Sequence, residues 1–114
     1  MYRAVLDSQE AGLAVVAPGV ACGAVDEAVR EVLRGYGYEK QFIHSTGHGV
    51  GLEIHEPPWI RLGNDDPLQP GDAITVEPGV YLPGIGGVRI EDMVLVTEVG
   101  SRVFTNSSKE PTAP

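Results

Sequence analysis

The hydrophobic pattern of this 114-residue chain changes its period once, near Tyr38. Before Tyr38, two stretches repeat apolar side chains at helical spacing, and Pro18 and Gly19 separate them. After Tyr38, short runs alternate apolar and polar side chains between turn-forming segments at 64–67, 83–87 and 99–101. The apolar stripes of the two expected helices are Tyr2, Val5, Leu6, Gln9, Leu13 and Val16, then Val25, Ala28, Val29, Val32, Leu33 and Tyr36. This order predicts an α+β fold in which two helices pack on one face of a mostly antiparallel sheet.

All three histidines of the chain, His44, His48 and His55, lie in a glycine-rich stretch. A single histidine is more often a surface or core side chain than a ligand. Here the histidines are clustered, and two glutamates, Glu77 and Glu91, follow on predicted strands. Imidazole and carboxylate groups suit Zn, Mn, Fe or Co, and glycines let the backbone approach a crowded ion. The pattern therefore favours a metal site.

Alternation sorts the side chains of the predicted strands onto two faces. The apolar face takes Val50, Leu52, Ile54, Ile74, Val76, Val88, Ile90, Val94 and Val96, and the other face takes Gly51, Glu53, His55, Thr75, Glu77, Arg89 and Glu91. We therefore expect Glu77, Arg89 and Glu91 to converge on one face of the sheet. Taken alone, the sequence RIED at 89–92 would indicate no more than a solvated ion-pair surface.

Three motifs occur in order: TGHGVG at 46–51, TVEPG at 75–79 and RIED at 89–92. With these motifs the chain resembles the C-terminal half of the catalytic domain of the Xaa-Pro peptidases, aminopeptidase P and prolidase. These belong to the creatinase and methionine aminopeptidase superfamily, which has the pita-bread fold. The resemblance covers 1–105 as a partial catalytic domain. The remaining segment, 106–114, is rich in Ser, Pro and Thr and is predicted to be disordered.

The resemblance implies metal-dependent hydrolysis of Xaa-Pro peptide bonds, with two divalent ions (Mn, Co or Zn) in an intact family member. It assigns metal ligation to His48, Glu77 and Glu91, and it makes Glu77 a catalytic residue as well. It gives His44 and His55 catalytic and substrate-binding roles beside the tetrahedral intermediate. Tyr81 and Arg89 would brace the site and line the subsite for proline. Trp59 is expected either to line a subsite or to pack.

One part of the family pattern is missing. The family takes two further ligands from aspartates on a hairpin far upstream of the ligand histidine, and only 47 residues precede His48 here. Asp7 and Asp26 lie in predicted helices. We therefore expect a fragment that holds at most one weakly bound ion and is inactive by itself. Because half of a two-fold fold is missing, we also expect that two chains can associate as a homodimer.

Three alternatives stay open beside the Xaa-Pro peptidase. A creatinase-like relative is disfavoured because the metal-binding residues His48, Glu77 and Glu91 are retained. A methionine-aminopeptidase-like relative is disfavoured by Tyr81 and Arg89. The third is a non-catalytic binding module with the pita-bread fold.

Bulk properties limit the partners and the compartment. The net charge of −8 argues against nucleic acid or an anionic membrane surface, since both require a basic patch. Cys22 is the only cysteine, which excludes an internal disulfide and suits a reducing compartment. No apolar run has the length of a membrane span, and no signal pattern opens the chain. The expected location is the cytoplasm.

Overall fold

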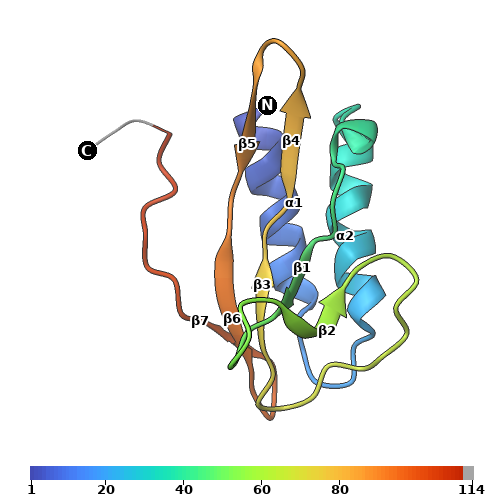
Figure 1. Ribbon diagram of the computed structural model, residues 1–114, viewed down its shortest axis with the longest axis vertical. Helices are drawn as coiled ribbons and strands as arrows, with labels where there is room; N and C mark the ends of the chain where they lie inside the picture. The colour runs from blue at the N-terminus through green and yellow to red at the C-terminus, as the bar shows by residue number, and fades with distance from the viewer. Residues whose placement is uncertain (112–114) are drawn as a thin grey trace.

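The computed structural model describes residues 1–111, and its two helices lie on the same side of the strands (Figure 1). Helix α1 spans Tyr2–Val15 and α2 spans Cys22–Gly35, as the two apolar stripes predict. A short 3-10 helix, η1, follows at Glu39–Gln41. Tyr36 differs from its prediction because it lies 47% exposed, with its hydroxyl donating to Asp7 rather than packing in the core. Within the described residues, neither helix has the length and apolar character needed to cross a membrane.

In the part of the chain that the structure describes, seven strands form two antiparallel sheets, so the predicted α+β class is confirmed. The five-stranded sheet has the order β2-β1-β3-β6-β7, and β4 and β5 form a separate pair. The bounds of the strands are β1 Gly47–Gly49, β2 Glu56–Ile60, β3 Ala73–Val76, β4 Gly79–Leu82, β5 Gly86–Arg89, β6 Asp92–Val96 and β7 Ser101–Val103.

The predicted strand through 50–55 is wrong. Gly51–His55 is a bent loop that connects β1 to β2, and Gly49 already pairs with Glu56 across it. Leu52 and Ile54, expected on a buried face, are 105% and 79% exposed. The chain reverses here because β2 pairs antiparallel with β1, with Gly49 opposite Glu56.

The hairpin from β3 to β6 is interrupted once on each strand. Glu77 and Pro78 separate β3 from β4, while Ile90 and Glu91 separate β5 from β6. Register is the same on both sides of the interruption, since Val76 lies opposite Asp92 and Gly79 lies opposite Arg89. Ile90 N–H donates to the carbonyl of Pro78 across the gap (3.2 Å). The interruption therefore leaves Glu77 opposite Glu91.

Among residues 1–111, the core lies between the helices and the sheets and has two clusters. One packs Val25 of α2 against Ile74, Val76, Val94 and Val96 of the larger sheet. The other packs helix residues Val5, Val29 and Leu33 against Val80 of β4 and against Phe42. Both clusters use the even-numbered strand face that the alternation assigned to the core, which leaves the odd-numbered face for polar side chains.

Residues 104–111 have no regular secondary structure. Lys109 in this segment contacts Asp92 through its ammonium group (2.6 Å), and its carbonyl accepts from the hydroxyl of Tyr2. The predicted disorder of 106–114 stays a prediction, and its last three residues lie outside the described residues.

Candidate metal centre

His48 is held by two hydrogen bonds that leave one ring nitrogen free. Its main-chain N–H donates to Thr75 Oγ1 (3.1 Å). Its ring Nδ1 lies 2.9 Å from the carbonyl of Gly49, so Nδ1 carries the proton that this bond needs. With the proton at Nδ1, the neutral form of the ring would present its lone pair at Nε2, which lies 3.7 Å from Glu77 Oε1. A metal-ligating histidine has this arrangement, with its second ring nitrogen donating to a carbonyl.

Glu77 and Glu91 form a pair of carboxyl groups at the interruption of the long hairpin. Directly opposite residues of an antiparallel pair place their side chains on one face, and like charges there are unfavourable. Burial is the main reason that the pKa of Glu77 rises to about 7, and the hydrogen bond and the charge of Glu91 add to it. Arg89 lowers this pKa in part. A cation between the two carboxylates would relieve the same repulsion.

These side chains meet at one cavity of about 330 Å³ on the odd-numbered face of the strands. Its polar lining comes from His48, His55, Thr75, Glu77, Arg89 and Glu91. The predicted convergence of Glu77, Arg89 and Glu91 is therefore present around the cavity. In the described part of the chain, however, no three His, Cys, Asp or Glu side chains are close enough together to hold an ion as they stand. Metal ligation by His48, Glu77 and Glu91 thus stays a prediction, although one nitrogen and two carboxylates suit Mn or Zn.

A second hollow of about 350 Å³ shares His48, His55, Glu77 and Arg89 with the first and adds His44 and Trp59. Trp59 was expected either to line a subsite or to pack, and its place in the lining of this hollow agrees with the first role. His55, at the end of the loop 51–55, places its ring 4.3 Å from that of His48. Side chains from the loops before and after β1 therefore lie beside His48 and Glu77.

His44 has a hydrogen bond at each ring nitrogen. Nδ1–H donates to the carbonyl of Ser45 (2.8 Å), so the hydroxyl of Tyr81 donates to Nε2 (2.7 Å). Tyr81 folds back over its own strand because Gly79 has no side chain, and a Cβ at Gly79 would lie 2.4 Å from the Tyr81 hydroxyl. His44 and Tyr81, which lie 37 residues apart, thus form one unit at the edge of the site.

Neither upstream aspartate reaches the cavity. Asp7 pairs with Arg3 on α1 (2.9 Å), and Asp26 pairs with Arg30 on α2 (2.5 Å). Sequence reasoning missed the part of Thr75, whose hydroxyl fixes His48, and of Met93, which lines the cavity. Their position two residues before Glu77 and two after Glu91 on the same strand face was the signal that could have identified them.

Residues 1–98 match the metallopeptidase family M24. The chain belongs to this family. It is 46% identical to the Xaa-Pro dipeptidase of Pyrococcus furiosus over 110 residues. The aligned region covers 96% of this chain and 32% of that protein. Among solved structures, it is similar to dipeptidase PepE from Mycobacterium ulcerans (47% identity, TM-score 0.93, 96% of this chain and 29% of that one). The Xaa-Pro dipeptidase from Bacillus anthracis is similar as well (49% identity, TM-score 0.93, 96% and 31%).

The resemblance to Xaa-Pro peptidases is thereby confirmed, as is the C-terminal part of a pita-bread fold. The chain spans about a third of the length of the relatives that it matches.

Proposed function

We propose that these residues form the metal-binding and proline-recognising part of an Xaa-Pro peptidase. The observation that carries the proposal is that His48 Nε2, Glu77 and Glu91 border one cavity, with Arg89, His44 and Tyr81 beside them. The names of the relatives favour a dipeptidase that cleaves an Xaa-Pro dipeptide.

In this proposal His48, Glu77 and Glu91 would hold a divalent ion, and Glu77 would also take up or return a proton during hydrolysis. When bound, such an ion would supply the Lewis acidity that lowers the pKa of water and polarises the scissile carbonyl. His44, held by Tyr81, and His55 contact the substrate at the carbonyl, while Arg89 and Tyr81 border the proline subsite. The carboxyl groups of partly buried Glu77 and exposed Glu91 are the acidic groups that would attract a cation to the cavity.

We infer that the 114 residues alone bind at most one ion, and weakly, because the two aspartates that the resemblance requires are not among them. Mn, Co or Zn fits the nitrogen and oxygen donors. Calorimetric titration with Mn²⁺ or Zn²⁺ checks this stoichiometry. Two tight sites per chain would contradict it.

A chimera tests the activity. The aligned C-terminal part of the Bacillus anthracis Xaa-Pro dipeptidase is replaced by this chain, which covers 31% of that protein. The chimera is expected to hydrolyse Xaa-Pro dipeptides with added Mn²⁺, whereas the isolated 114 residues are not. His48→Ala, Glu77→Ala and Glu91→Ala should each abolish turnover together with metal binding.

Two outcomes would oppose the proposal in different ways. A folded chimera that binds metal but does not cleave Xaa-Pro dipeptides would favour the non-catalytic binding module instead. Chelator-sensitive cleavage by the isolated chain would show that these residues need no further aspartates.

Homodimer formation and a cytoplasmic location belong to the same proposal. Ile54 at the cavity and Leu52 in the same loop are exposed and offer apolar surface for a second chain. Light scattering that shows only monomer at high protein concentration would contradict the proposed homodimer. Fractionation of the native cells, with detection by antibody, checks the location.

A further inference from the structure

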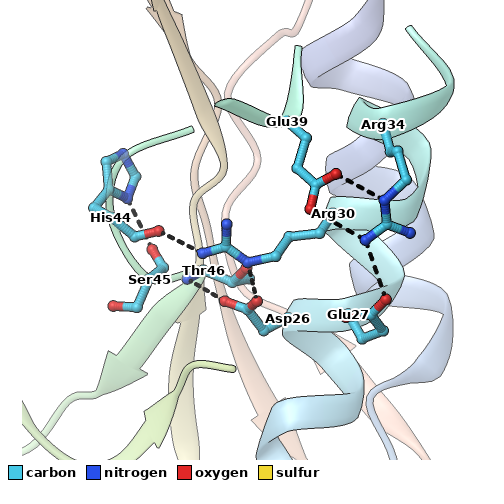
Figure 2. Close-up of polar contacts among 8 residues, drawn as sticks. All are labelled: Asp26, Glu27, Arg30, Arg34, Glu39, His44, Ser45 and Thr46. Carbon is cyan, nitrogen blue, oxygen red and sulfur yellow. Dashed lines mark hydrogen bonds and ion pairs between the residues drawn. The ribbon is translucent and has the colours of Figure 1, made fainter. Parts of the chain in front are cut away.

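Asp26 and Arg30 of α2 do not line the cavity, but they hold the segment that carries His44 (Figure 2). The Asp26 side chain is fully buried, and 17% of the Arg30 side chain is exposed. Arg30 Nε lies 2.5 Å from Asp26 Oδ1, one helical turn away. The two side chains form a buried ion pair on the helix face that meets residues 44–46.

One further polar atom of each side chain bonds to a main-chain group of this segment. Arg30 Nη2 donates to the carbonyl of His44 (3.1 Å), and Asp26 Oδ2 accepts from the N–H of Thr46 (3.2 Å). Residues 42–46 belong to no helix or strand. The helix side chains therefore satisfy peptide groups that a neighbouring strand would otherwise satisfy.

Arg30 also acts on the ring of His44 through Phe42. The guanidinium lies over the Phe42 ring, 4.5 Å from its centroid. Phe42 meets His44 edge-on, with the ring centroids 5.0 Å apart and the planes at 85°. Arg30 thus sets the main chain of His44 directly and its imidazole through one intervening ring.

The same segment is tied to the metal-binding side chains. The carbonyl of Thr46 accepts from the N–H of Glu77 (2.7 Å), so the main chain at Thr46 is held by Asp26 on one side and by Glu77 on the other. His48 follows two residues later on β1. A shift of the ion pair would therefore move both His44 and the start of β1.

Stability alone does not account for this arrangement. Replacing a buried ion pair by apolar side chains of similar volume is often neutral or stabilising. What apolar side chains cannot supply is the fork of donors and acceptors that matches the peptide groups of His44 and Thr46. The ion pair is therefore suited to hold the main chain of His44 and Thr46 in place.

We propose that Asp26 and Arg30 are positioning residues that fix His44 against Tyr81 and beside the metal-binding side chains. The contact of His44 with substrate rests on the proposed function, but its placement by α2 does not.

Nitrogen NMR of the imidazoles tests the placement without any assay of activity. The chain has only three histidines, so each ring can be assigned in the labelled 114-residue chain. Arg30→Lys keeps the charge but cannot bond Asp26 and the His44 carbonyl together while stacking on Phe42. It should shift and broaden the His44 ring signals and remove the signature of the hydrogen bond at Nε2.

Arg34→Lys is the matched control. Arg34 lies one turn further along α2 and pairs on the surface with Glu39 (2.7 Å), with 51% of its side chain exposed (Figure 2). This substitution should leave the His44 signals unchanged. The double variant Asp26→Leu/Arg30→Met removes both charges together, so it should fold as measured by circular dichroism and still lose the placement of His44.

Kinetics in the chimera give an independent measurement. Arg30→Lys and the double variant should lower kcat by about 10- to 100-fold, with KM and metal affinity nearly unchanged. If both variants match Arg34→Lys in the His44 signals and in kcat, the positioning role is wrong. If the unsubstituted chimera is inactive, the proposed function fails, and the NMR comparison still decides the placement.

Discussion

At the scale of single residues, Glu77 is subject to opposing effects. Burial and Glu91 raise the pKa of its carboxyl to about 7, while Arg89 lowers it. Metal ligands must be deprotonated, so a proton and a cation compete for the same oxygen. The affinity of this site for a cation should therefore depend on pH near neutrality.

We predict that the affinity for Mn²⁺ falls by about tenfold per pH unit below pH 7 if one proton is displaced. Below the raised pKa the Glu77 carboxyl keeps its proton, and above it the carboxylate is free to accept a cation. Calorimetry in two buffers with different ionisation enthalpies measures the proton release. Glu98→Gln, in an exposed turn, is the control and should leave the affinity for Mn²⁺ and its pH dependence unchanged. An affinity that is constant from about pH 8 to about pH 6 would contradict the prediction.

Residue alternation predicted the common face of Glu77, Arg89 and Glu91, and it did so although the last run is two strands rather than one. It succeeded because the interruption at Ile90 and Glu91 preserves the register of the hairpin. It could not find Asp26. A carboxylate on a helix looks like an ordinary solvated residue until the chain at Thr46 is known to pass beside it.

At the scale of elements, β1 depends on two glycines that flank His48. A Cβ on Gly47 would lie 1.8 Å from the carbonyl oxygen of Thr75, and one on Gly49 would lie 2.2 Å from that of Pro57. These are backbone atoms of the neighbouring chain segments, so they cannot rotate away. The glycines therefore let β1 lie close to its neighbours on both sides, which sets the depth of His48 in the cavity.

Gly49→Ala is expected to lower the free energy of unfolding by about 1–3 kcal/mol or more, because a methyl group cannot fit without moving β1 from β2. Urea unfolding measures it. Gly35→Ala is the control, since nothing lies within 4 Å of its Cβ position and its change should be neutral or stabilising by about 0.5–1 kcal/mol. Equal effects of the two substitutions would mean that the close approach at β1 is not required.

The loop 51–55 shows why part of the site could not be predicted at this scale. Val50, Leu52 and Ile54 alternate with Gly51, Glu53 and His55 as a half-buried strand would. Alternation of apolar and polar side chains indicates a strand only where another layer of the protein covers the apolar face. Residues 51–55 form a loop instead, and the side chains of Leu52 and Ile54 are exposed. His55 still arrives at the cavity, because the loop carries it back beside His48.

At the scale of the whole molecule, Asp92 connects three distant parts of the chain. Its side chain is fully buried, and Oδ2 accepts from Gln9 of α1 (2.8 Å) and from Lys109 of the C-terminal segment (2.6 Å). Asp92 follows Glu91 directly. No sequence pattern indicated this network, because its members lie 83 and 17 residues from Asp92 and Lys109 lies in a segment of low-complexity composition.

Lys109→Met is therefore expected to lower the free energy of unfolding by about 1–3 kcal/mol, because it leaves a buried carboxylate with one charged donor fewer. Met keeps the apolar stem of lysine, so packing changes little. Lys40→Met, at an exposed lysine, is the control and should stay within about 0.5 kcal/mol of the unsubstituted chain. In Asp92→Asn/Lys109→Met the buried charge is also gone, so the loss should be smaller than the sum of the single effects. Additive losses in this cycle would mean that Lys109 acts independently of Asp92.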